Sequence, residues 1–251
     1  MIKFIRRKAR GARMRLLQWL TPSPVRAYGE RTMMYATQQD TSQPNSFLIG
    51  LAIKAISRAQ DVSLTELISR QESNATDYPD LWPGEHYRLL AALVAVLQPI
   101  VVVEIGSYQG LSALSLTKFL PSKCRVTTFD VVPWDQCPDT CLTPDDFADG
   151  RLVQQIGDLS QPHVFELHKA LLSDAQVIFL DAPKDGIFER KFLQLLATLK
   201  DSVPKLLIFD DIRTWNMLAI WREIPFPKLD LTSFGHWTGT GLVDWKPNAK
   251  S

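Results

Sequence analysis

Carboxylates and one lysine occur together in two short stretches, Asp181-Ala-Pro-Lys184 and Asp210-Asp211. The first aspartate of each stretch is the last residue of an apolar run typical of a buried strand, at residues 177–181 and 206–210. The carboxyl ends of parallel strands meet at one edge of a sheet, so these carboxylates should converge. Buried like charges are costly unless a cation neutralises them. The sequence therefore favours a divalent metal site of Asp181, Asp210 and Asp211, with Mg²⁺ suited to such oxygen ligands, over the alternative that one or more of these acids cap the helix that follows.

A second group of residues surrounds a glycine turn, Glu104-Ile-Gly106-Ser107-Tyr-Gln-Gly110, which follows an apolar run at 100–105. Its spacing, E-x-G-x-x-x-G, is not the G-x-G-x-x-G of dinucleotide binders. An acid at such a turn repels a pyrophosphate but attracts a cationic ligand. S-adenosylmethionine carries a sulfonium and an ammonium group and no phosphate, so Glu104 suits this ligand.

Two more acids follow the next two apolar runs. Asp130 lies about twenty residues beyond Gly110, where a carboxylate can accept hydrogen bonds from both ribose hydroxyls of a nucleoside. Gly157-Asp158 would place a second carboxylate beside the adenine amino group. Either acid alone is also explained as a loop cap. Their order and spacing after the glycine turn favour an S-adenosylmethionine site that also includes Gly106, Ser107 and Gly110.

The elements that must position these residues alternate along the chain. Short β-branched runs at 100–105, 125–130, 152–156, 177–181 and 206–210 indicate strands, and helical patterns fall at 111–120, 162–173 and 186–200. Such alternation predicts an α/β, doubly wound, mostly parallel sheet with helices on both faces. Runs at 228–234 and 240–246 predict a closing antiparallel hairpin. We expect one domain over 46–251, with a helical lead-in at 46–98.

Residues from about 80 to 245 resemble a class I methyltransferase domain, with Val103-Glu-Ile-Gly-Ser-Tyr-Gln-Gly110 as its first motif. The resemblance implies a Rossmann-like, seven-stranded sheet whose last strand is antiparallel, and it adds Ser112 to the cofactor site. Asp181-Ala-Pro-Lys184 followed by Asp210-Asp211 resembles the metal-dependent O-methyltransferases of the catechol O-methyltransferase type and related natural-product enzymes. Asp211 stands where the catechol enzymes have Asn, which leaves the substrate class open. The family also implies a homodimer.

The mechanism that this resemblance implies is methylation of a hydroxylated small molecule. The metal would lower the pKa of a substrate hydroxyl, and Lys184 would accept the proton before the oxyanion attacks the sulfonium methyl. Lys184 is also explained as a salt-bridge partner of the acids. Aromatic and polar residues that could line the substrate pocket, or belong to the core, are Trp82, Glu85, His86, Tyr87, Trp215, His236 and Trp237.

Two rival hypotheses remain open on the sequence. The first is a methyltransferase without metal, with nitrogen or carbon as the acceptor. The second is a non-catalytic module that keeps the fold for binding. Sensitivity to chelators separates the first from the metal-dependent enzyme, and the absence of cofactor binding would favour the second.

Charge is unevenly distributed along the 251 residues. Residues 1–31 carry nine Lys or Arg and one acid, whereas the remainder has seven more acids than bases, which argues against a nucleic-acid substrate. In this basic extension (residues 1–45), apolar residues alternate with the bases. It is interpreted either as an amphipathic helix on a membrane or partner, or as a poorly ordered leader.

Cysteine usage and hydropathy indicate the compartment. The three cysteines, Cys124, Cys137 and Cys141, make an odd count that does not suggest a disulfide framework. Whether Cys137 and Cys141 pair stays open. No apolar run approaches the roughly 18 residues that cross a bilayer. We expect a cytoplasmic protein, with peripheral membrane contact through residues 1–31 as an open alternative.

Overall fold

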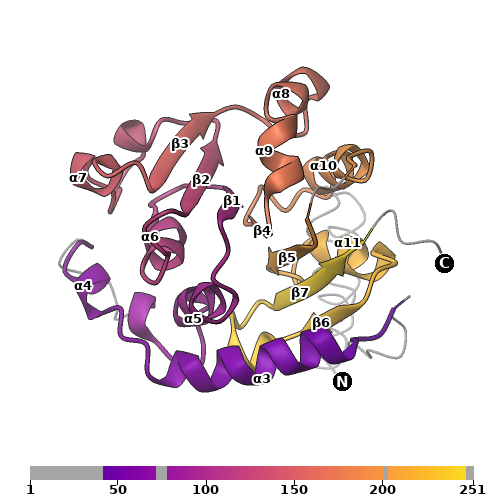
Figure 1. Cartoon of the computed structure of the whole chain (residues 1–251), viewed down its shortest axis with the longest axis horizontal. Coiled ribbons are helices and arrows are strands. Elements are labelled where there is room, and N and C mark those ends of the chain that lie inside the picture. The colour runs from indigo at the N-terminus through magenta and orange to yellow at the C-terminus, as the bar shows by residue number, and fades with distance from the viewer. Residues whose placement is uncertain (1–41, 72–77, 201–202, 247–251) are drawn as a thin grey trace, which may run out of the picture.

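The computed structural model describes residues 42–71, 78–200 and 203–246. Its centre is a seven-stranded sheet of order β3-β2-β1-β4-β5-β7-β6 (Figure 1). The strands are β1 Val101–Ile105, β2 Arg125–Asp130, β3 Leu152–Ile156, β4 Val177–Leu180, β5 Lys205–Asp210, β6 Lys228–Asp230 and β7 Thr240–Trp245. β7 is antiparallel to both β5 and β6, while β3, β2, β1, β4 and β5 pair in parallel. The predicted doubly wound, mostly parallel seven-stranded sheet with an antiparallel last strand is confirmed.

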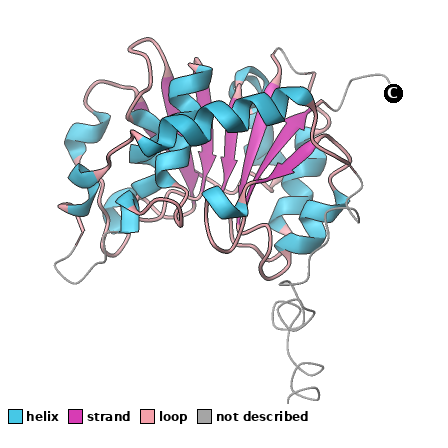
Figure 2. Cartoon of the chain, turned by 90° about the horizontal axis from the view of Figure 1, so that it is seen from below, coloured by secondary structure: helices cyan, strands magenta, loops and turns pink. Residues whose placement is uncertain are grey.

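Helices cover both faces of this sheet (Figure 2). The longer ones are α3 Ser46–Gln60, α5 Tyr87–Leu97, α6 Leu111–Thr117, α10 Phe188–Leu196 and α11 Met217–Glu223. The shorter ones are α4 Thr65–Ile68, α7 Pro144–Phe147, α8 Pro162–Leu167 and α9 Lys169–Asp174, with 3₁₀ turns at Tyr78–Asp80, Trp134–Gln136 and Thr232–Phe234.

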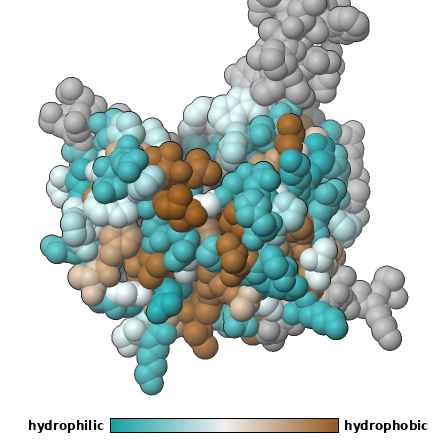
Figure 3. Space-filling model, turned by 90° about the horizontal axis from the view of Figure 1, so that it is seen from above, coloured by the Kyte–Doolittle hydropathy of each residue, from teal (hydrophilic) through white to brown (hydrophobic). Residues whose placement is uncertain are grey.

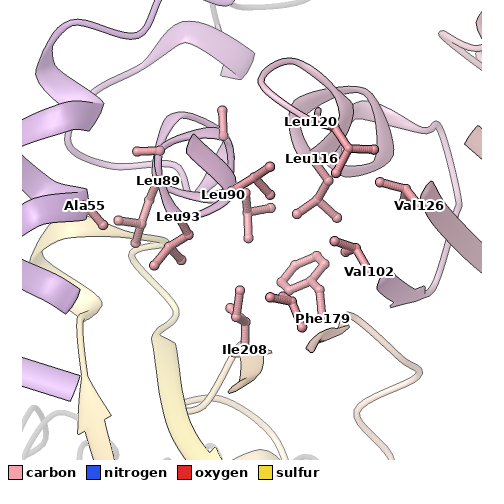
Figure 4. Packing of buried hydrophobic residues seen from close by; sticks show 14 of the residues in the cluster. Ala55, Leu89, Leu90, Leu93, Val102, Leu116, Leu120, Val126, Phe179 and Ile208 are labelled. Atoms are coloured by element: carbon pink, nitrogen blue, oxygen red, sulfur yellow. The ribbon is translucent and has the colours of Figure 1, made fainter. Parts of the chain in front are cut away.

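Alternate side chains of each strand enter two separate cores, as the two-residue period of a strand requires. Val102, Phe179 and Ile208 pack with α3, α5 and α6 on one face (Figure 4). Their neighbours Val103 and Ile178 pack on the other face with residues of α8 to α11. Burial on both faces explains why these strands are almost wholly apolar.

Two of the predicted helices differ from the structure. The segment 162–173 is two helices, because the chain leaves helical geometry at His168, whose ring packs edge-on against Phe129 of β2. The helix expected from 186 begins at Phe188. Gly186 has a φ of 75°, and Asp185 Oδ1 accepts the backbone N–H of both Ile187 and Phe188, as a helix cap does.

The surface of the domain mixes polar and apolar side chains. Figure 3 shows the molecule from the top of the view in Figure 1, and apolar patches (brown) lie there among hydrophilic side chains. Scattered exposed apolar residues are ordinary for a folded domain. Among the described residues, no helix is long and apolar enough to span a bilayer. The basic extension lies almost entirely outside the described residues, so its two interpretations stay predictions.

Candidate active site

Two adjoining clefts open where the parallel strands end. The sheet order reverses between β1 and β4, and ligands of open α/β sheets bind at such a switch point. One cleft holds about 460 Å³ and the other about 340 Å³. Gly106, Tyr108 and Asp181 line both clefts. A ligand in one cleft can therefore present a group to the other.

The larger cleft, here called the nucleoside cleft, contains Asp130, Gly157 and Asp158 among its lining residues. Asp130 Oδ2 accepts the backbone N–H of Tyr108 at 3.0 Å, and its Oδ1 accepts that of Val132 at 3.1 Å. These bonds fix the carboxylate at the end of β2, with acceptor capacity left on each oxygen. The structure thus brings together the residues that sequence analysis assigned to ribose and adenine.

Asp158 lines the same cleft just after β3. Its Oδ1 accepts the backbone N–H of Ser160 at 2.8 Å, and its Oδ2 accepts from Gln161 Nε2 at 3.0 Å. Burial favours the protonated carboxyl, but these hydrogen bonds outweigh it and lower the pKa of Asp158 below its ordinary value. Asp158 is therefore a carboxylate at neutral pH.

The two turn glycines serve packing as well as ligand approach. Gly106 has a φ of 98°, and a Cβ there would overlap the carbonyl oxygen of Asp181. Gly110, with a φ of 86°, faces the side chain of Leu142 where a Cβ would stand. Both positions thus need glycine for backbone conformation and for close contact with a neighbouring segment. Gly106 in particular lets β1 and β4 end side by side.

Glu104 lies beneath this turn in β1 and is fully buried. Neither of its carboxylate oxygens makes a hydrogen bond of normal geometry to a described residue. Burial raises the pKa of Glu104 to about 8, and the nearby hydroxyls of Ser112 and Thr128 oppose the shift. A buried acid in this state gains most from a cationic neighbour.

The predicted serines belong to the smaller cleft. Ser107 and Ser112 both line it. Ser107 Oγ lies 2.7 Å from Thr128 Oγ1 and accepts from Gln154 Nε2 at 3.2 Å, so it ties the turn to β2 and β3. Its contacts within the protein point to support of the glycine turn.

The smaller cleft, here called the acidic cleft, gathers the predicted metal ligands around an ammonium group. Lys184 Nζ donates to Asp181 Oδ1, lies 2.8 Å from Asp211 Oδ2, and reaches Asp210 Oδ2 at 3.5 Å. Asp210 and Asp211 are buried, while the Asp181 side chain is 28% exposed. The three carboxylates thus surround Lys184, as the salt-bridge interpretation of this lysine requires.

The backbone at this cluster is unusual. Lys184 has a φ of 62° and Asp211 a φ of 57°, values that residues with a Cβ seldom adopt. Such conformations persist only where the surrounding structure enforces them, and they concentrate at functional sites. Glu189 of α10 enforces the first, because its Oε1 accepts the backbone N–H of Lys184 at 2.9 Å.

Two histidines complete the acidic cleft. His236 Nδ1 lies 3.0 Å from Asp210 Oδ1 and 3.6 Å from Asp211 Oδ1. His86 Nδ1 lies 3.4 Å from the same Asp210 oxygen. The sequence suggested that both histidines could line the substrate pocket, but it did not indicate that either could bind a metal. They come from segments 150 residues apart, which no local spacing could have joined.

The charges in this cleft perturb one another. Burial lowers the pKa of Lys184, but the charges of Asp181, Asp210 and Asp211 outweigh it and raise the pKa well above the ordinary value. His236 is affected in the same sense, because Asp210, Glu85 and Asp211 raise its pKa against the effect of burial. As it stands, Lys184 is a fixed cation and not a base.

The remaining predicted pocket residues divide between the cleft and its surroundings. Tyr87 lines the acidic cleft, whereas Glu85 is buried behind it with Oε2 at 3.3 Å from His236 Nε2. Trp82 packs against the core, and Trp215 and Trp237 are exposed and line neither cleft. Aromatic residues near a site in sequence thus proved a weak signal. Cys137 and Cys141 are both free.

No protein-family model matches the chain, and no curated protein matches it. Several solved structures are similar to it. An SAH-bound methyltransferase of Podospora anserina is 16% identical over 87% of this chain and 95% of that one, with a TM-score of 0.47. A putative caffeoyl-CoA O-methyltransferase of Staphylococcus aureus is 15% identical over 63% and 82%, with a TM-score of 0.46. An SAH complex of a Bacillus cereus O-methyltransferase is 15% identical over 76% and 90%, with a TM-score of 0.45. At these identities, function must be argued from the site.

Proposed function

We propose that this protein is an S-adenosylmethionine-dependent O-methyltransferase that acts on a hydroxyl of a small molecule, with a divalent metal ion in the acidic cleft. One observation carries the proposal. The nucleoside cleft, with Asp130 and Asp158, meets the acidic cleft at Gly106 and Asp181. This juxtaposition would place a methyl donor beside a site suited to a divalent metal ion and to the hydroxyl oxygen of a substrate.

The residues of the nucleoside cleft fit S-adenosylmethionine. Asp130 has acceptor capacity for ribose hydroxyls, and Asp158 has it for an exocyclic amine. Glu104 lines neither cleft, but it supplies a buried carboxyl beneath the glycine turn that a cationic ligand would neutralise. When bound, S-adenosylmethionine supplies an electrophilic methyl group next to its sulfonium. The protein then contributes by aligning the acceptor with that methyl and by excluding water.

The residues of the acidic cleft also fit a dication. Three carboxylates face a single lysine ammonium, which leaves negative charge uncompensated. Asp210 and Asp211 would hold the ion together with Asp181, and a bound dication lowers the pKa of a hydroxyl that it coordinates. Lys184 would accept a proton only when another cation offsets the surrounding carboxylates. Otherwise it orients the acids and attracts a substrate oxygen.

The metal-independent alternative has one observation in its favour. Lys184 already contacts all three acids, so the cluster has a cation of its own. In that case the acceptor could be nitrogen or carbon, and Lys184 would stay protonated throughout. Cofactor binding is common to both alternatives, whereas divalent ions and chelators affect only the metal-dependent enzyme.

Calorimetric titration with S-adenosylmethionine and S-adenosylhomocysteine, with and without Mg²⁺, tests the proposal. We expect the wild type to bind both, and Asp130→Asn to bind about tenfold or more weakly, because a charged acceptor to ribose is lost. Asp61→Asn, which alters an exposed acid after α3, is the matched control and should bind normally. Absence of cofactor binding by the wild type would overturn the proposal and favour a binding module.

A further inference from the structure

The donor atoms around Asp210 are not all oxygens. Asp210, Asp211 and His236 each offer one ligand atom, and these atoms all lie within 4.8 Å of one another. Among the predicted ligands, Asp181 faces Lys184 and is 28% exposed. The third donor beside the acidic pair is therefore the imidazole of His236.

The separations of these atoms match those of ligands around one ion. Asp210 Oδ1 and His236 Nδ1 are 3.0 Å apart, and His236 Nδ1 and Asp211 Oδ1 are 3.6 Å apart. Neighbouring ligands on an ion with bonds of about 2.0–2.2 Å lie about 2.8–3.6 Å from each other in octahedral or tetrahedral geometry. These two separations place His236 Nδ1 where it could share one ion with either carboxylate.

The opposite side of the His236 ring is arranged as it is in histidines that bind metals. Glu85 Oε2 lies 3.3 Å from His236 Nε2, and both side chains are largely buried. A carboxylate there favours the proton on Nε2 and leaves the lone pair on Nδ1, which is the nitrogen that faces Asp210 and Asp211. A cation between them would bind that lone pair together with the two carboxylate oxygens, whereas without a cation a protonated Nδ1 donates to Asp210 Oδ1. Thr238 Oγ1 lies 2.9 Å from Nδ1, and its hydroxyl hydrogen can rotate to point away from that nitrogen.

His86 is a second, independent sign of a ligand at this place. Its side chain is 3% exposed, and neither ring nitrogen makes a hydrogen bond of normal geometry to a described residue. Its Nδ1 lies 3.4 Å from Asp210 Oδ1, the oxygen that His236 also approaches. Two imidazoles thus converge on one carboxylate oxygen from α5's start and from the segment before β7. A buried imidazole such as His86, whose nitrogens make no hydrogen bond of normal geometry to a described residue, is costly unless something binds it.

We propose that His236 is a metal ligand and that the acidic cleft takes a first-row transition dication, such as Mn²⁺ or Co²⁺, in preference to Mg²⁺. Affinity for a mixed nitrogen and oxygen site rises along the first transition row from Mn²⁺, whereas Mg²⁺ strongly prefers oxygen and gains little from an imidazole. The inference rests on the proposed metal-dependent function and specifies its ion. Glu85 is the positioning residue that orients His236.

Pulsed electron paramagnetic resonance of Mn²⁺ added to the full chain tests the proposal directly. We expect the nitrogen coupling of a coordinated imidazole in the wild type and its loss or marked reduction in His236→Asn. His163→Asn, an exposed histidine of α8, is the matched control and should keep the coupling. A wild-type spectrum without imidazole coupling overturns the proposal whether or not the variant folds.

Calorimetric titration with Mn²⁺ and Mg²⁺ provides the second measurement. His236→Asn should bind Mn²⁺ at least about tenfold more weakly while its Mg²⁺ affinity changes about twofold or less, because asparagine still offers an oxygen. Equal losses for both ions, no loss, or no Mn²⁺ binding by the wild type would each overturn the proposal. S-adenosylhomocysteine binding, titrated on the same samples, shows separately whether the methyltransferase function holds.

Discussion

The Glu189 carboxylate holds the backbone of Lys184, five residues earlier in the chain. Glu189 Oε1 accepts the Lys184 N–H at 2.9 Å, and Oε2 accepts the Gly186 N–H at 2.8 Å. Glu189 is buried at the start of α10, so it connects this helix to the loop that carries Asp181 and Lys184. The position of the Lys184 ammonium among its three carboxylates therefore depends on a residue outside both clefts.

Removal of this support should destabilise the protein. Glu189→Ala leaves the buried N–H of Gly186 and the partly buried N–H of Lys184 without acceptors, at about 1–3 kcal/mol for a buried group, while Glu189→Gln keeps one good acceptor and should lose about half as much. Denaturant unfolding measures both. Glu66→Ala, which removes an exposed partner of Lys118, is the control and should cost less than about 1 kcal/mol. Equal stabilities of the Ala and Gln variants would contradict the role given to the two oxygens.

Glu104 should make the protein less stable as the pH rises. Its pKa is about 8 in the folded chain and near 4.5 when unfolded, so ionisation opposes folding between these values. Glu104→Gln removes this effect, and its melting temperature should exceed that of the wild type above pH 8 by more than it does at pH 5. Thermal unfolding across this pH range tests the sign.

The same substitution should weaken S-adenosylmethionine binding, because the neutral amide cannot compensate a cationic ligand. In the wild type, ligand binding should release protons below pH 8, as the cation favours the ionised Glu104. Titration in buffers of different ionisation enthalpy measures this release. Binding without proton release in the wild type would show that the ligand's positive charge does not reach Glu104.

Lys184→Met should leave Asp181, Asp210 and Asp211 without their common cation. Breaking buried ion pairs in this way costs about 3–5 kcal/mol. The carboxylates keep the pKa of Lys184 above its ordinary value, so this stabilisation is constant from neutral pH up to the pKa of free lysine and is lost as the pH rises further. The deficit of the variant should shrink in acid, where the acids become protonated, and on addition of a divalent ion. A deficit that neither acid nor metal reduces would contradict a charge effect.

Gly106→Ala should lower the free energy of unfolding far more than the same substitution at Gly50. Gly106→Ala combines a φ of 98° with overlap of the Asp181 carbonyl, and a loss of about 3 kcal/mol or more is expected. Gly50→Ala, in α3 with open space around the added carbon, should instead stabilise by about 0.5–1 kcal/mol. Denaturant unfolding of the two variants measures the contrast. A similar effect at both positions would show that the turn can rearrange.

Most elements of the fold could be predicted from the sequence alone. Runs such as 125–130 and 152–156 became β2 and β3 at the predicted bounds, because the Val, Ile, Thr and Phe residues in them favour strands. The break at His168 was not predictable, since residues on both sides are compatible with helix and the interruption accompanies packing on Phe129. Local pattern thus gives the type of element, and tertiary packing decides where it ends.

The acids of the site were also visible in the sequence, because Asp130, Asp181 and Asp210 each follow a recognisable strand and parallel strands end at one edge. The residues from distant segments that surround these acids could not be assigned to them from the sequence. Glu85 and His86 precede α5, His236 lies before β7, and only the folded sheet brings them to Asp210. The left-handed backbone of Lys184 and its support by Glu189 likewise arise from tertiary contacts. Strand ends are a local property of sequence, whereas distances between side chains on separate segments are set only when both are packed against the same core.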